Sequence, residues 1–119
     1  DIAIFHVSIA DREGNLYIAR QSELKIMAHA ARQTFVTAEQ IVDYNILENE
    51  ELAAASISSL YVSGVAEAQR GAWPLNLPGH YEIDTGELEK YSCCATEDKT
   101  FQTYVRTRIT DGYADATAA

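Results

Sequence analysis

The sequence predicts an α/β domain built on part of an open, mostly parallel sheet with flanking helices. Three observations carry this prediction. Apolar, strand-like segments alternate along the chain with segments of helical periodicity, the order typical of a sheet covered by helices. Residues 1–10, DIAIFHVSIA, form a nearly continuous apolar run that suits a strand buried on both faces. The 119 residues are enough for one compact core.

A turn and a helix follow the first strand. Residues 10–15, ADREGN, are polar, and Gly14 tolerates positive φ at the corner of a turn. A short strand resumes over 16–19. Ser22 is placed to cap a helix that continues to about residue 32. Apolar residues share one face of this helix: Leu24, Met27, Ala28 and Ala31.

The middle of the chain has three weaker signals. Residues 34–37 form a second short apolar segment, and Thr37 with Gln40 fits a capping box that would begin a helical turn. Residues 45–55 are acidic and then alanine-rich, which indicates a surface helix or a structured loop. Residues 59–65 predict a further strand.

The C-terminal part of the sequence predicts a loop followed by two helices. Residues 71–79, GAWPLNLPG, hold both prolines and predict an irregular loop. Helices are expected over 85–95 and 97–109, with Thr96 as the cap of the second. Each helix has one apolar face, formed by Leu88, Tyr91 and Ala95 in the first and by Phe101, Tyr104, Val105 and Arg108 in the second. Residues 110–119 have little to bury, so we expect a mobile tail.

Charge and cysteine content exclude several classes of protein. The chain has 18 acidic and 9 basic residues, a formal charge of −9, which repels phosphate backbones and argues against nucleic acid as a partner. No apolar stretch is long enough for a membrane span, and no export leader opens the chain. Cys93 and Cys94 are neighbours, a poor geometry for a mutual disulfide. We therefore expect free thiols and a cytoplasmic location.

The search for catalytic motifs returns little. His6, His29 and His80 are too scattered along the sequence to indicate a metal site. His6 fits a satisfied core histidine. His80 follows a Pro-Gly pair in the loop, a better place for function, but a structural role is still the favoured interpretation for it. The nucleotide-binding glycine patterns and the G-x-S-x-G elbow are absent. The acidic run ILENEE, residues 46–51, fits a solvated face better than a catalytic glutamate.

One longer pattern is far more specific. Residues 3–43 contain an apolar strand, then A-D-x-x-G-N, a short strand, an alanine-rich helix and V-x-x-E-Q-I-V-D. This order resembles the alpha-subunit half of the family I coenzyme A transferases. Downstream, residues 71–91, GAWPLNLPGHYEIDTGELEKY, are similar to a segment of the glutaconate-type alpha subunits. The resemblance covers nearly all of residues 1–109 and implies the C-terminal half of such a subunit, with a coenzyme A transferase-like fold.

The resemblance implies a chemistry that this chain would share with a partner. Members of the family move coenzyme A between an acyl-CoA and a carboxylate through a glutamyl-CoA thioester. The nucleophilic glutamate belongs to the beta subunit, in a Glu-Asn-Gly context. Glu48-Asn49 is followed here by Glu50, so the nucleophile cannot be carried over to this chain. No permanently bound cofactor is implied, and the coenzyme A thioester is a substrate. The glycine-rich loop of the alpha subunit is expected upstream of Asp1, because the chain begins inside a core strand.

Seven residues are candidates for the coenzyme A pocket or the subunit interface: Gly71, Ala72, Trp73, Pro74, His80, Asp11 and Asn15. The 71–74 segment could supply backbone donors and a pocket wall. Trp73 suits an interface anchor, a pocket floor or a core position equally well. Asp11 and Asn15 fit a turn that fixes neighbouring strands. Two alternative functions stay open: a ring-opening hydrolase of coenzyme A thioesters on the same scaffold, and a non-catalytic ligand-binding or interaction module.

Overall fold

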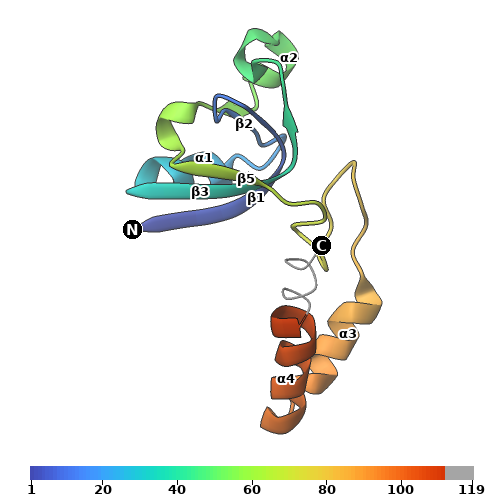
Figure 1. Ribbon diagram of the computed structural model, residues 1–119. Helices are drawn as coiled ribbons and strands as arrows, with labels where there is room; N and C mark the ends of the chain where they lie inside the picture. Colours follow the sequence, from blue (N-terminus) through green and yellow to red (C-terminus); the bar gives the residue numbers. More distant parts are fainter. Residues whose placement is uncertain (112–119) are drawn as a thin grey trace. The chain divides into compact units, whose positions relative to one another are not determined.

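Five strands form one mixed sheet in the order β4-β2-β1-β3-β5 in the computed structural model (Figure 1), which describes residues 1–111. The long central strands β1 (Ile2–Asp11) and β3 (Gln33–Val42) run parallel, as do β3 and β5 (Gly64–Glu67). The two-residue strand β2 (Leu16–Tyr17) pairs antiparallel with β1, and β4 (Ser56–Ile57) pairs antiparallel with β2 at the edge of the sheet. The predicted α/β class is therefore confirmed, with the parallel pairing confined to the longer strands.

The chain forms two compact units, each of which is described by itself. The sheet unit comprises Asp1–Trp73 and Leu77–Tyr81, and the described part of the helical unit comprises Pro74–Asn76 and residues 82–111. In the sheet unit, α1 (Glu23–Ala30) connects β2 to β3. Short helices η1 (Ile46–Glu48), α2 (Glu50–Ala53) and η2 (Ser59–Tyr61) lie between β3 and β5. The helical unit holds α3 (Thr85–Cys94), α4 (Asp98–Val105) and the π-helical turn η3 (Arg106–Thr110).

The core of the sheet unit lies between α1 and one face of the sheet. Val36 and Ala38 of β3 lie two residues apart and so share this face, and Val7 and Ala10 of β1 also contribute. The buried cluster consists of Val7, Ala10, Leu16, Ile18, Leu24, Ala28, Val36, Ala38 and Ile57. On α1, Leu24 and Ala28 confirm the predicted apolar face, whereas Met27 is 41% exposed and Ala31 lies just past the helix end.

The expectation that the first strand is buried on both faces was wrong. Ile2 and Ile4 of β1 are 58% and 72% exposed, and Phe35 of β3 is 41% exposed. Ile4 and Phe35 are register partners in the parallel pair, so they lie on the same face. The first strand is thus buried on one face and open over its first half on the other. An unbroken apolar run could not distinguish these two cases.

Three local capping and strand expectations were wrong. Thr37 and Gln40 begin no helical turn, because both are paired with β1 in the middle of β3. Of residues 59–65, the first part is η2 and only the end belongs to β5. Thr96 does not cap α4, since its hydroxyl donates to the carbonyl of Cys93 at the end of α3.

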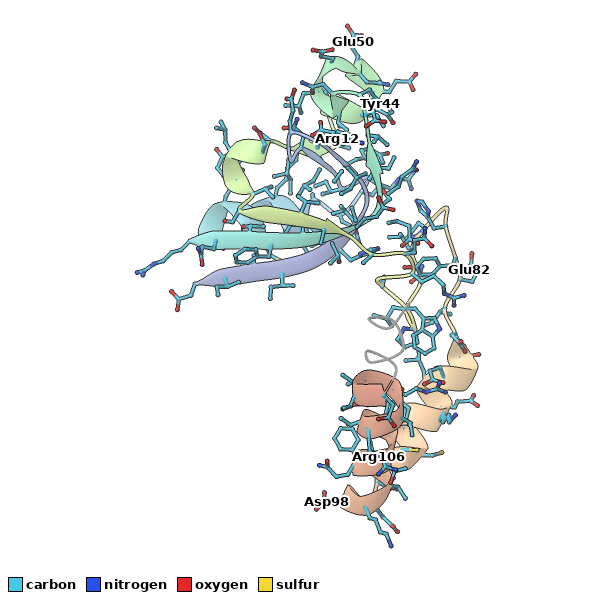
Figure 2. All side chains as sticks on the ribbon, in the orientation of Figure 1. Arg12, Tyr44, Glu50, Glu82, Asp98 and Arg106 are labelled. Carbon is cyan, nitrogen blue, oxygen red and sulfur yellow. The ribbon has the colours of Figure 1, made fainter. Side chains whose placement is uncertain are left out.

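Other expectations for the polar and C-terminal segments agree with the structure. Glu50, labelled in Figure 2, lies in α2, and it is exposed together with Glu48 and Glu51, as expected for a solvated face. Cys93 and Cys94 are free thiols on α3. Within residues 1–111, none of the helices combines the length and apolar character that a bilayer crossing requires. The expected tail, 110–119, begins at the end of η3, and residues 112–119 lie outside the described part of the chain.

Candidate functional site

A polar network occupies the second half of the sheet face that the core does not use. His6 and Thr37 are register partners on β1 and β3, and His6 Nδ1 lies 2.8 Å from the Thr37 hydroxyl. His6 Nε2 lies 3.1 Å from Oε2 of Glu39, two residues further along β3. The same Oε2 accepts a hydrogen bond of 3.3 Å from the hydroxyl of Tyr81. Side chains far apart in the sequence thus converge on one carboxylate.

The segment that follows β5 closes over this network. The backbone N–H of Arg70 donates to Glu39 Oε1 at 2.6 Å, and the Arg70 guanidinium lies 5.7 Å from the centre of the Tyr81 ring, a cation–π distance. Ala72 N–H donates to the Tyr81 hydroxyl at 2.9 Å. A Cβ built on Gly71 would lie 2.5 Å from Cε1 of His6. Only glycine lets the backbone approach the imidazole this closely.

The electrostatics of the network keep Glu39 charged. Burial opposes its ionisation, but hydrogen bonds from the Arg70 N–H, His6 and Tyr81 outweigh burial and lower the pKa of Glu39. Burial raises the pKa of Tyr81, and the negative charge of Glu39 adds to this shift against the opposing hydrogen bond from Ala72. At neutral pH the network therefore contains a carboxylate that accepts and a neutral phenol that donates.

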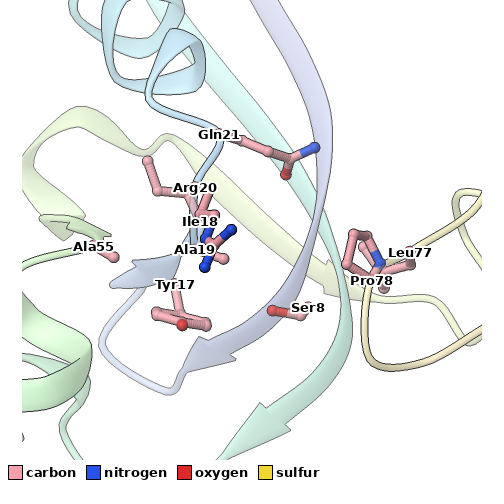
Figure 3. Close-up of a pocket in the computed structure, with 9 residues that line it drawn as sticks. All are labelled: Ser8, Tyr17, Ile18, Ala19, Arg20, Gln21, Ala55, Leu77 and Pro78. Atoms are coloured by element: carbon pink, nitrogen blue, oxygen red, sulfur yellow. The ribbon is translucent and has the colours of Figure 1, made fainter.

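A pocket of about 520 Å³ adjoins this network (Figure 3). Segment 17–21 forms one side, Leu77 and Pro78 form the other, and Ser8 of β1 lies between them. Ala55 completes the wall. The backbone N–H of Leu77 donates to the Tyr81 carbonyl at 3.0 Å, and the N–H of Tyr81 donates to the Leu77 carbonyl at 3.1 Å. These two bonds connect the pocket wall at Leu77 to the network at Tyr81.

Asp11 and Asn15 form a separate, structural turn. Asp11 is 3% exposed, and its carboxylate accepts from the backbone N–H groups of Glu13, Asn15 and Ile46 and from the Asn15 side chain, at 2.8 to 3.0 Å. Asn15 is 1% exposed and accepts from Ser59 N–H. Burial opposes ionisation of Asp11, but these hydrogen bonds outweigh it and lower its pKa. The polar groups of the turn are occupied in holding β1 to the segments after β3 and β4.

Of the other predicted site residues, some contact the network and others do not. Gly71 and Ala72 contact the network directly, at His6 and Tyr81. Trp73 is half-buried, with its N–H bonded to the Arg70 carbonyl, and Pro74 falls in the helical unit, where its carbonyl accepts from Asp84 N–H. His80 is exposed and joins the network only through its neighbour Tyr81.

The 71–74 segment does not offer the free donors expected of it. The N–H groups of Gly71, Ala72 and Trp73 are all bonded within the sheet unit, to Ala68 O, Tyr81 Oη and Arg70 O. These N–H groups are therefore not available to bind an anion.

Sequence reasoning missed Glu39 and Tyr81 as members of a site. His6 was expected to be a satisfied core histidine, and both ring nitrogens do have partners, with the side chain 9% exposed. The available signal was a glutamate within an apolar, alternating run, which in a strand requires a partner when buried. Within residues 1–111, histidine, cysteine and carboxylate side chains form no group of three suited to a metal ion.

The comparisons with known proteins agree on the fold. No protein-family model matches this sequence, and no curated protein matches it. Among solved structures, glutaconate coenzyme A-transferase from Acidaminococcus fermentans is similar over 93% of this chain, with a TM-score of 0.85 and 26% identity. A variant of the decarboxylase AibA/AibB is similar over 92% of the chain, with a TM-score of 0.77 and 26% identity.

The similarity extends over less than half of the chain of each neighbouring structure. This chain spans 35% of the transferase chain and 39% of the decarboxylase chain. Within that span, the five-stranded mixed sheet with its flanking helices has a coenzyme A transferase-like α/β fold.

Proposed function

We propose that this chain is part of a coenzyme A transferase alpha subunit. It would act with a beta subunit to move coenzyme A between an acyl-CoA and a carboxylate, through a glutamyl-CoA thioester formed on the beta subunit. The observation that carries the proposal is the similarity to glutaconate coenzyme A-transferase, at 26% identity and a TM-score of 0.85 over 93% of the chain.

The carboxylates of the sheet unit support a nucleophile on another chain. A glutamate that attacks a thioester needs an available lone pair and a reactive acyl group within reach. Glu39 and Asp11 are the carboxylates with lowered pKa values there, and each is held by three or more hydrogen bonds. Such saturation stabilises the charge and reduces nucleophilicity, so both residues act as structural anchors.

The proposed role of this chain is to shape one wall of the acyl-CoA site. Arg70 and Ala72 are held by hydrogen bonds to Glu39 and Tyr81, and Trp73 and Pro74 follow them directly in the chain. We assign Gly71, Ala72, Trp73 and Pro74 to the wall that faces coenzyme A or the beta subunit, with His80 at its edge. The proposed role of Asp11 and Asn15 is to fix the turn after β1.

The test uses the natural full-length protein, purified with any chain that accompanies it. Incubation with acetyl-CoA and a series of short carboxylates should produce the corresponding acyl-CoA. Borohydride should reduce the glutamyl-CoA thioester on the partner chain to a primary alcohol, with release of coenzyme A, at a glutamate followed by Asn-Gly. A thioester found on this chain, or transfer without any partner, would overturn the division of roles.

A second candidate, decarboxylation, is favoured by the similarity to AibA/AibB. Both neighbours show that one scaffold is compatible with two reactions. A parallel incubation therefore supplies a carboxylated acyl-CoA and measures the release of carbon dioxide. Release of carbon dioxide from a carboxylated acyl-CoA, without coenzyme A exchange, would favour the decarboxylase over the transferase.

A further inference from the structure

The pocket beside the network combines apolar walls with a cation at its rim. Ile18, Ala55 and Leu77 give it an apolar lining, and about 520 Å³ lies within the range of small-molecule sites. Arg20 lines the same pocket and is exposed. An apolar cavity with one charged group at its mouth favours a ligand with an apolar body and one end of opposite charge.

Arg20 differs from the other arginines of the sheet unit. Arg12 pairs with Asp43, Arg32 lies 3.8 Å from Asp1, and Arg70 lies over the Tyr81 ring. Among the described residues, the Arg20 guanidinium has no carboxylate or aromatic partner. In a chain with twice as many acidic as basic residues, an unpaired arginine is available for an anion from outside.

The backbone next to Arg20 is in an unfavourable conformation. Ala19 has φ of +50°, in the left-handed region that is unfavourable for a residue with a Cβ. Ala19 also lines the pocket. Strained residues of this kind persist where the surrounding structure holds them, and they concentrate at ligand sites. The backbone conformation of Ala19 sets the direction in which the chain continues to Arg20 at the rim of the pocket.

We propose that this pocket binds a short-chain carboxylic acid, with its carboxylate on Arg20 and its hydrocarbon chain against Ile18, Ala55 and Leu77. The role of such a subsite, holding the free acid that accepts or leaves coenzyme A, rests on the proposed function. Binding of the acid itself does not depend on the proposed function. The proposal can therefore be tested without any turnover.

The experiment measures binding of butyrate, pentanoate and hexanoate to the natural full-length protein with its accompanying chain, by saturation-transfer NMR and calorimetry. The matching alcohols test the charge requirement. Affinity should rise with chain length, and each acid should bind about tenfold more tightly than its alcohol, since a charge-assisted hydrogen bond is lost. Equal binding of acids and alcohols, or displacement of the acid by equimolar inorganic phosphate, would overturn the proposal.

Two variants and one control locate the site. Arg20→Gln should weaken acid binding about tenfold and leave alcohol binding unchanged. Ala55→Leu fills the apolar end and should weaken both ligands, which tests the site independently of Arg20. Arg32→Gln changes an exposed arginine outside the pocket and should have no effect. Acid binding that both pocket variants leave unchanged places the acid elsewhere and refutes the assignment.

The two proposals fail in different ways. Arg20-dependent acid binding without coenzyme A transfer would refute the transferase and leave the subsite in place. Transfer activity with wild-type kinetics in Arg20→Gln and Ala55→Leu, and no acid binding in the NMR experiment, would refute the subsite and leave the transferase in place.

Discussion

Gly71 lies so close to the His6 ring that a side chain cannot be added without movement. Gly71→Ala should lower the free energy of unfolding of the sheet unit by about 1–3 kcal/mol, as overpacking does elsewhere. Urea denaturation measures the change. In a His6→Ala background the same substitution should cost less, because the ring that it meets is gone. An unchanged cost in that background would contradict the contact.

Because of Glu39, the free energy of unfolding of the sheet unit depends on pH in the acidic range. Its pKa is lower in the folded chain than in the unfolded chain, so its contribution is present above about pH 4 and is lost as the pH falls further. Glu39→Gln should reduce the loss of stability between pH 7 and pH 3, measured by urea denaturation at each pH. Glu48→Gln, at an exposed position, serves as the control and should behave as wild type. An identical acid dependence in Glu39→Gln would be evidence against this role.

Thr34 carries a buried hydroxyl for which the described residues provide no hydrogen-bond partner. Thr34→Val keeps the shape and removes this polar group, so we expect a gain of about 1 kcal/mol in stability. Thr37→Val is the matched control on the same strand. It removes the 2.8 Å contact with His6 Nδ1 and should destabilise the protein. Destabilisation by Thr34→Val would indicate that the hydroxyl is satisfied.

At the scale of elements, one buried carboxylate links α3 to α4 and η3. Glu87 is 7% exposed and accepts from the Tyr104 hydroxyl at 2.9 Å and from Arg108 at 2.8 Å. Burial raises the pKa of Tyr104, and Glu87 raises it further, so the phenol stays a donor. Tyr91 also packs edge-on against Phe101 and Tyr104. The predicted apolar faces of the two helices therefore meet around a polar contact that the pattern did not show.

Glu87→Ala should loosen this helix pair. We expect a loss of about 1–2 kcal/mol, below the value for a fully buried ion pair because the Arg108 side chain is 38% exposed. Thermal unfolding followed by circular dichroism measures the loss of helix. Glu89→Ala, at an exposed position of the same helix, is the control and should have little effect. Equal effects of the two substitutions would show that the Glu87 contacts are not stabilising.

At the scale of the whole molecule, the proposed role of the chain is to supply a scaffold and a wall of the acyl-CoA site. The 119-residue chain alone should show no exchange of labelled coenzyme A between an acyl-CoA and a carboxylate, because the proposed division of roles places the nucleophilic glutamate on the beta subunit. Exchange should appear with the full-length chain and its partner. Detectable exchange by the short chain would require a nucleophile among the residues described here.

The sequence alone was sufficient for the α/β class, the first strand, the turn at Gly14, the first helix and the two C-terminal helices. Each of these depends on local signals: apolar periodicity, a glycine at positive φ, or helical spacing. The same local signals failed at Thr37, where a capping pattern lost to pairing with β1, because backbone hydrogen bonds across a sheet outweigh a single cap.

The candidate site depended on tertiary structure. His6, Glu39 and Tyr81 lie 33 and 42 residues apart in sequence, and only the parallel register of β1 and β3 and the return of the 70–81 segment bring them together. The open half of the sheet face around Ile4 was likewise invisible in an apolar run, since composition does not say which face is covered. Which residues share a site follows from long-range pairing, and no local pattern in the sequence specifies that pairing.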